Sequence, residues 1–165
     1  RVNVPSENIL IAGCEMKDGH GGVTIGSEVS GSVRNVFAEN CRMDSPHLDR
    51  ALRLKTNAVR GGVVENIYMR NVTIGQVADA VLHVGFHYEE GAKGDFMPVV
   101  RNIRMTDVTC SRSRHALYLR GLEKSPITGV VLERCTFGGV QRPDVLEHVR
   151  GLVCREVKVN GAPRA

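Results

Sequence analysis

Apolar and polar residues alternate along this chain in short runs that recur at unequal intervals. Six segments share an Asn or Gly that is followed by apolar residues one, three, six and eight positions later. Successive segments are 27, 31, 36, 27 and 22 residues apart, counted between Asn8, Asn35, Asn66, Asn102, Gly129 and Gly151. Unequal steps exclude the strict helical repeats and favour a solenoid whose loops vary in length.

Each segment contains one change of phase in its alternation. Side chains along a strand change face every residue, so apolar offsets 1 and 3 followed by 6 and 8 require a bend near offset 5. That offset holds residue types that tolerate left-handed backbone, namely Gly13, Asn40, Asn71 and Asp107. Each segment is therefore predicted to form a strand, a sharp corner and a second strand.

A further set of short alternating runs lies between these segments. Aligned on a small first residue, the runs are 22–25, 51–54, 80–83 and 116–119, and this alignment puts His83 at an aliphatic position. Each coil is then expected to carry about three short strands, with equivalent positions stacked at about 4.8 Å. No helical pattern alternates with the strands, which excludes doubly wound α/β and barrel folds. The prediction is an all-β, single-stranded parallel β-helix.

Composition and charge change this picture little. The 165 residues are 42% apolar and carry a net charge of +4, a mild excess that suits an anionic partner. No apolar run approaches the ~20 residues of a membrane span, and we expect neither a membrane nor a nucleic-acid partner. The five Cys form no C-x-x-C pair, and Cys14, Cys41 and Cys135 share an inward column. We expect buried, reduced thiols, no metal site and no cofactor.

Two outward clusters are candidates for chemistry. One is the run Asp18-Gly19-His20-Gly21-Gly22, followed by Ser27 and Glu28. The other is Arg53 and Lys55, which must both point outward if Leu52 and Leu54 point inward. His20 and Arg53 are 33 residues apart, about one coil, so stacking is expected to bring an imidazole and two cations to one face. Such a face suits a carboxylate ligand.

Two motifs resemble those of the polygalacturonases, glycoside hydrolase family 28. Residues 19–28 (GHGGVTIGSE) are similar to the family's G-H-G and I-G-S-E signature, and residues 50–56 (RALRLKT) to its R-G-L-R-I-K-T segment, with Leu54 in place of Ile. Residues 61–67 (GGVVENI) follow in the same order, and residues 87–91 (HYEEG) resemble the segment that carries an active-site tyrosine. The likeness covers nearly the whole chain.

The resemblance implies a right-handed β-helix that hydrolyses α-1,4-galacturonosidic bonds in pectin or oligogalacturonate with inversion. It implies that His20 supports the catalytic carboxylates, that Arg53 and Lys55 bind the galacturonate carboxylate, and that Tyr88 shapes the sugar subsite. Ser27 and Glu28 are interpreted as structural support. Because relatives act outside the cytoplasm, the expected location is secreted or periplasmic.

The chain also departs from the family pattern. The family's catalytic aspartates lie in N-T-D and D-D segments before G-H-G, and the 19 residues before His20 contain neither. We assign no general acid or base, since Asp18 is off the catalytic position and Asp49 is expected at the surface. Residues 1–165 are thus expected to be the C-terminal coils of a glycosidase domain, truncated on the N-terminal side and inactive alone. The intact enzyme is expected to be a monomer, whereas the exposed coil edge of the fragment predicts self-association.

Two alternatives stay open. A β-helix polysaccharide lyase would need a base beside the sugar carboxylate, often with Ca²⁺, and no cluster of outward acids suggests a calcium site. A non-catalytic, carbohydrate-binding solenoid would lack catalytic aspartates upstream. The loop between Glu89 and Pro98 belongs to the longest step of the repeat, and loops of this kind select among pectic substrates.

Overall fold

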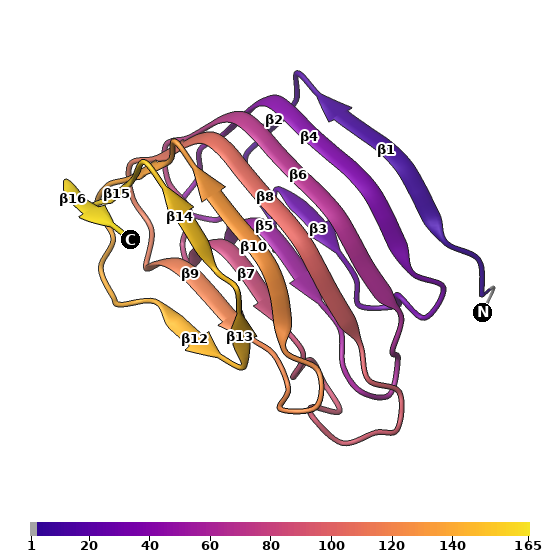
Figure 1. Cartoon of the computed structure of the whole chain (residues 1–165). Helices are drawn as coiled ribbons and strands as arrows, with labels where there is room; N and C mark the ends of the chain where they lie inside the picture. Colours follow the sequence, from indigo (N-terminus) through magenta and orange to yellow (C-terminus); the bar gives the residue numbers. More distant parts are fainter. Residues whose placement is uncertain (1–2) are drawn as a thin grey trace.

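Each repeat forms one coil of a right-handed parallel β-helix in the computed structural model, which describes residues 3–165 (Figure 1). A typical coil pairs one short strand with one long, bent strand, and the described residues contain no helix. The strands are β1 (Ser6–Ala12), β2 (Glu15–Met16), β3 (Val23–Ile25), β4 (Val33–Met43), β5 (Arg50–Lys55), β6 (Val63–Ile74), β7 (Ala80–Gly85), β8 (Val99–Cys110), β9 (His115–Arg120), β10 (Ile127–Glu133), β11 (Thr136–Phe137), β12 (Val145–Glu147), β13 (Val149–Arg150), β14 (Val153–Arg155), β15 (Val157–Val159) and β16 (Ala162–Arg164). The predicted fold class is confirmed.

Two sheets enclose the core. The long-strand sheet is built around β1, β4, β6, β8 and β10, and the short-strand sheet has the order β12-β9-β7-β5-β3. Within residues 3–165 the described strand pairs are parallel except at the C-terminal end, where β15 and β16 are antiparallel. The outer faces of the two sheets therefore point away from each other across a common apolar interior (Figure 1).

The register of the long-strand sheet agrees with the predicted repeat. Val36 pairs with Ile9 on one side and Ile67 on the other, and Ile67 pairs in turn with Ile103. In the middle coils the residues at offsets 1, 3, 6 and 8 are buried, as they are in β6 at Ile67, Met69, Val72 and Ile74. The predicted inward and outward faces of this sheet are therefore confirmed. A register wrong by one residue would have placed the whole apolar set on the outer face.

The predicted corner is present, but it does not divide the strand. The offset-5 residues have positive φ, from Gly13 at 64° through Asn40 at 55° to Asp107 at 54°. The shared Asn/Gly column is a second corner, with φ of 57° at Asn35 and Asn66. Because one left-handed residue turns the chain without ending the ladder, β4, β6 and β8 are continuous. The expected three short strands per coil are therefore two strands, one of them bent twice.

One predicted alignment in the short-strand sheet is wrong by a residue. Val23 pairs with Leu52, Leu52 with Leu82, and Leu82 with Leu117, so Val81 and not Ala80 matches Ala51. His83 consequently stacks in register with Arg53 and Tyr118 instead of facing the core. The prediction was wrong because the runs were aligned on a small residue. Leu82 and Val84 on either side of His83 are buried, so the alternation along β7 points His83 outward.

The five cysteines are free thiols in the structure. Cys41, Cys110 and Cys135 are buried as predicted, and burial raises the pKa of the Cys110 thiol to about 11. Cys14 is exposed, since the first coil is covered on one side only. On that coil Leu10 is 64% exposed and the inward-facing Ile9 is 39% exposed.

Candidate functional site

Two basic side chains project from β5 on the outer face of the short-strand sheet. Leu52 and Leu54 are buried, and Arg53 and Lys55 alternate with them and reach the surface, as predicted. Thr24 precedes Arg53 in the coil stack and His83 follows it. The stacking of successive coils therefore builds this face from one residue of each strand.

Arg53 and Lys55 have no acidic partner. Neither forms an ion pair with any residue that the structure describes, and the buried Nε of Arg53 has no hydrogen-bond partner there. Burial, and then repulsion from Arg50, lowers the pKa of Arg53 from its ordinary value. Burial, and then repulsion from Arg53, lowers the pKa of Lys55. A bound anion would offset both effects, because an opposite charge favours the protonated forms.

Tyr88 lies beside this pair. Its ring is 4.5 Å from the Lys55 Nζ, a cation–π distance. The buried Asn57 holds the turn that carries Tyr88, because its amide nitrogen donates to the Tyr88 carbonyl at 2.8 Å. A cavity of about 170 Å³ opens here, and its lining includes Arg53, Lys55, His83, His87, Tyr88 and Tyr118. The structure thus brings together three of the four predicted site residues.

His20 lies in the segment that precedes β3, outside that cavity. It is expected beside Arg53, yet the coil step at this point is 29 residues, and the partner of Arg53 is Thr24. The exposed His20 ring instead pairs through Nδ1 with Asp49 at 3.0 Å. A Cβ atom at Gly21 would lie 3.2 Å from the Cβ of Arg53, so the residue after His20 lies close to the base of the Arg53 side chain.

Asp49 lies at the surface, as predicted, with its side chain 37% exposed, but it is part of a polar network. Its carboxylate is shared between His20 and Arg50, which lies 3.4 Å away. Arg50 also reaches Asp79 at 2.9 Å and donates from Nε to His83 Nδ1 at 3.1 Å. A chain of polar contacts therefore leads from His20 to the cavity.

His83 is one of the cavity residues, with Tyr118 and Arg120, that the sequence interpretation missed. Its ring stacks on Tyr118 with centroids 4.7 Å apart, and Nδ1 accepts from Arg50, which leaves Nε2 to carry the proton of the neutral ring. Burial lowers the pKa of His83; the Asp79 contact opposes this and the charge of Arg50 adds to it. His83 thus presents a neutral N–H donor. Its position between Leu82 and Val84, like that of Arg53 between two leucines, was the available signal.

Arg60 is a second basic residue next to the Tyr88 ring. The Arg60 side chain is only 8% exposed, and its guanidinium lies 5.4 Å from the Tyr88 ring. It contacts the carboxylates of Glu28 at 3.5 Å and Glu89 at 2.5 Å. Glu28 therefore helps to hold the wall of the cavity, which is a structural contact.

Two features typical of other classes of protein are absent from the described residues. No group of three or more His, Cys, Asp or Glu side chains within residues 3–165 is arranged to hold a metal ion. Over the same residues, no helix is long and apolar enough to cross a membrane.

Comparison with known proteins gives a consistent result. Residues 1–153 match the model of the family described as Glycosyl hydrolases family 28. A probable polygalacturonase of Vitis vinifera is 29% identical over 69% of this chain and 23% of its own length. A polygalacturonase of Ralstonia solanacearum is 29% identical over 82% of this chain and 27% of its own. The chain thus spans about a quarter of these relatives.

Solved structures agree with these sequence matches. A hyperthermoactive exopolygalacturonase from Thermotoga maritima superposes with a TM-score of 0.91 at 33% identity, covering 97% of this chain and 36% of that one. A family 28 exopolygalacturonase of Yersinia enterocolitica, at 20% identity, shares the fold with a TM-score of 0.68 over 91% of this chain and 30% of its own.

Proposed function

The chain belongs to glycosyl hydrolase family 28, and on that premise we propose that it is part of an enzyme that hydrolyses α-1,4-galacturonosidic bonds in pectin or polygalacturonate with inversion. The observation that carries the proposal is the pair Arg53 and Lys55. Both are partly desolvated, and they stand side by side without an acidic partner among residues 3–165. Each residue of a galacturonate chain supplies the missing carboxylate.

Arg53 and Lys55 bind that carboxylate in our proposal. A guanidinium offers parallel N–H donors that match the two oxygens of a carboxylate, and an ammonium adds a compact charge. The buried Nε of Arg53 has no hydrogen-bond partner among residues 3–165, so that atom does not tie the guanidinium to the protein. Because a neutral sugar satisfies neither cation, this pair would select uronic acids over neutral hexoses.

Tyr88 and His20 complete the proposed site. The Tyr88 ring, fixed between Lys55 and Arg60, forms one wall of the sugar subsite. His20 supports the catalytic carboxylates by hydrogen bonding, as it already binds a carboxylate in Asp49 at 3.0 Å. His83, although absent from the motif resemblance, adds an N–H donor to the same cavity.

Inversion needs two further carboxyl groups. One protonates the leaving oxygen, and the other activates a water on the opposite side of the sugar, with the pair separated by about 6.5–9.5 Å. We assign neither role to a residue of this chain. We propose that preceding coils of a longer protein supply both, because most of the length of each relative lies outside the matched region. The chain alone would then bind oligogalacturonate without cleaving it. Because the proposed substrate is a polymer of the cell wall, we also propose that the protein is secreted or periplasmic.

Product analysis tests the proposal. The protein made from the complete reading frame is incubated with polygalacturonate, and early products are followed by proton NMR. We expect new reducing ends whose first anomer is β, the opposite of the α linkage, and no ultraviolet absorbance. An unsaturated, absorbing product would identify a lyase, a first-formed α anomer would exclude inversion, and absence of products would favour a non-catalytic solenoid.

A further inference from the structure

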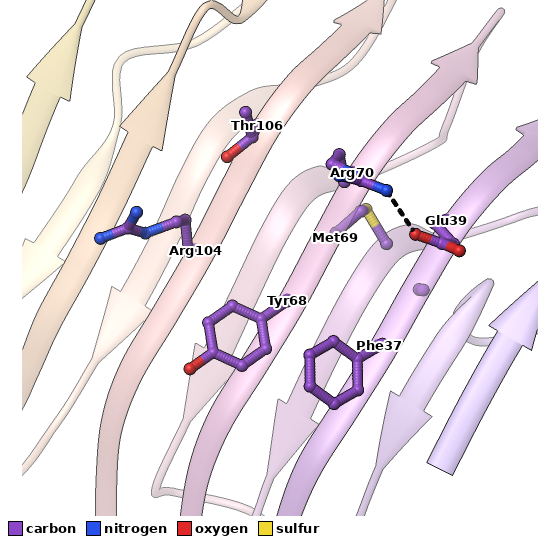
Figure 2. Close-up of a pocket in the computed structure, with 8 residues that line it drawn as sticks. Phe37, Glu39, Tyr68, Met69, Arg70, Arg104 and Thr106 are labelled. Atoms are coloured by element: carbon purple, nitrogen blue, oxygen red, sulfur yellow. Dashed lines mark hydrogen bonds and ion pairs between the residues drawn. The ribbon is translucent and has the colours of Figure 1, made fainter. Parts of the chain in front are cut away.

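An aromatic pair is exposed on the outer face of the long-strand sheet. It lies away from the cavity at Arg53, Lys55 and Tyr88, which is called the cleft from here on. Phe37 of β4 and Tyr68 of β6 are paired in register, and Arg104 of β8 follows in the same column (Figure 2). These positions lie between the buried offsets 1 and 3, so their side chains must point outward. The core lies between this face and the site around Arg53, so one sugar residue cannot contact both.

The two rings form a stepped platform. Their centroids are 5.0 Å apart with 19° between the planes, and Figure 2 shows the rings side by side. Phe37 is 45% exposed, which is high for a large apolar side chain. The Tyr68 hydroxyl accepts a hydrogen bond from Asn102 at 3.0 Å, which fixes the ring. The platform is therefore apolar, accessible and rigid.

Two arginines lie beside the platform, and they differ in whether an acid is paired with them. Arg70 pairs with Glu39 at 2.9 Å, so that charge is compensated (Figure 2). Arg104 is exposed, and no ion pair or hydrogen bond of its side chain occurs within the part of the chain that the structure describes. Together these side chains line a cavity of about 290 Å³. Its one uncompensated charge is positive, so an anionic ligand fits it better than a neutral or cationic one.

We propose that this face is a second, non-catalytic binding site for an acidic sugar chain, formed by Phe37, Tyr68 and Arg104. The apolar face of a pyranose ring would pack on the aromatic platform, and its carboxylate would bind the Arg104 guanidinium. The choice of galacturonan as the chain rests on the proposed function, whereas the aromatic and cationic surface does not. A site behind the cleft would keep the protein on the polymer while the cleft releases product.

A tryptophan reporter tests this directly, since the chain contains no Trp. The variant Phe37→Trp is made in the Arg53→Ala/Lys55→Ala background, so that the cleft no longer contributes, and is titrated with trigalacturonate. We expect a saturable change in Trp fluorescence. Adding Arg104→Gln should weaken the apparent affinity about tenfold, and so should replacing the ligand by its methyl ester, because each removes one charged hydrogen-bond partner.

Three results would overturn the proposal: no fluorescence change, a change that Arg104→Gln leaves intact, or equal binding of the ester. A change that follows protein concentration instead of sugar would also overturn it, because the face would then be covered by a second copy. Calorimetry of the Arg53→Ala/Lys55→Ala chain with and without Arg104→Gln answers the same question without the reporter. Loss of cleft binding in the Arg53→Ala chain tests the proposed function separately, so the two failures are distinguishable.

Discussion

Two outward rows of basic side chains, one on each sheet of this solenoid, differ in their partners. On the long-strand sheet, Arg34 pairs with Glu7 at 2.6 Å and Arg101 with Glu65 at 2.7 Å, each across one coil. The corner asparagines also form a ladder, in which Asn66 donates to Asn35 at 3.0 Å. On the short-strand sheet, Arg53 faces Thr24 and His83 across the same spacing and finds no opposite charge.

The difference lies in what the neighbouring coils supply. Coil stacking places every outward residue about 4.8 Å from its equivalents, so a cation acquires a partner whenever a neighbouring coil supplies an acid. Along β5 neither neighbouring coil supplies one to Arg53. Partial burial of unpaired cations lowers stability, and a ligand carboxylate reverses that cost. Arg53 and Lys55 are therefore cations that the solenoid leaves unpaired, as it does Arg104 on the other sheet, and we propose a binding site at each place.

The largest effect on stability is expected at a corner of the long-strand sheet. Asn66→Ala loses two ladder bonds, to Asn35 and from Asn102, and places a Cβ-bearing residue without a polar side chain at φ 57°. We expect a loss of about 2–3 kcal/mol in the free energy of unfolding, measured in urea. Asn66→Gly keeps the backbone freedom and should recover about 1 kcal/mol. Equal losses in both variants would contradict a backbone contribution.

The next effect concerns ligand affinity. Arg53→Ala removes a charged donor from the proposed subsite, and we expect trigalacturonate to bind about 10- to 100-fold more weakly by calorimetry. Arg101→Ala removes an arginine of the long-strand sheet that is already paired with Glu65. Its affinity should stay within about twofold of the unmodified chain. Matching losses in both variants would show that general positive charge, not the β5 site, attracts the ligand.

A smaller effect on the stability of the protein is expected when one ion pair of the long-strand sheet is removed. Arg101→Ala breaks an exposed ion pair, and such pairs contribute about 0–1 kcal/mol. Thermal unfolding at low and high salt should differ little from that of the unmodified chain. A loss above about 2 kcal/mol in the free energy of unfolding would mean that the Arg101–Glu65 pair stabilises the protein more than an exposed ion pair normally does.

The smallest effect is expected in the pH dependence of stability. The pKa of His83 is lowered in the folded chain, so the unfolded chain binds the proton more readily. Stability is therefore unaffected by His83 at neutral pH and above, and declines as the pH falls below the ordinary histidine value of about 6.5. His83→Gln should flatten this decline between about pH 5 and 7. An unchanged slope in the variant would place the titration elsewhere.

The sequence predicted the long-strand sheet better than the site. The Asn/Gly column and its apolar offsets recur in every coil, so the register from Ile9 to Ile103 followed from alternation alone. In the short-strand sheet only a small residue guided the alignment, which matched Ala80 with Ala51, whereas the structure matches Val81 with Ala51. A slip of one residue reversed the face of His83.

Other features of the site depend on the local coil length. His20 meets Asp49 because the step between their coils is 29 residues, and loop length, which the sequence pattern does not fix, sets that step. The contacts of Tyr88 with Lys55 and Arg60 likewise depend on how the turn after β7 folds. The motifs identified Arg53, Lys55 and Tyr88, and only the structure showed their separation from His20.

A crystal structure of this chain with digalacturonate would show whether Arg53 and Lys55 bind the sugar carboxylate. We expect a sugar carboxylate within about 3 Å of both the Arg53 guanidinium and the Lys55 ammonium, with a sugar ring against Tyr88. A cleft that stays empty at saturating ligand, or a sugar whose carboxylate contacts neither cation, would contradict this expectation.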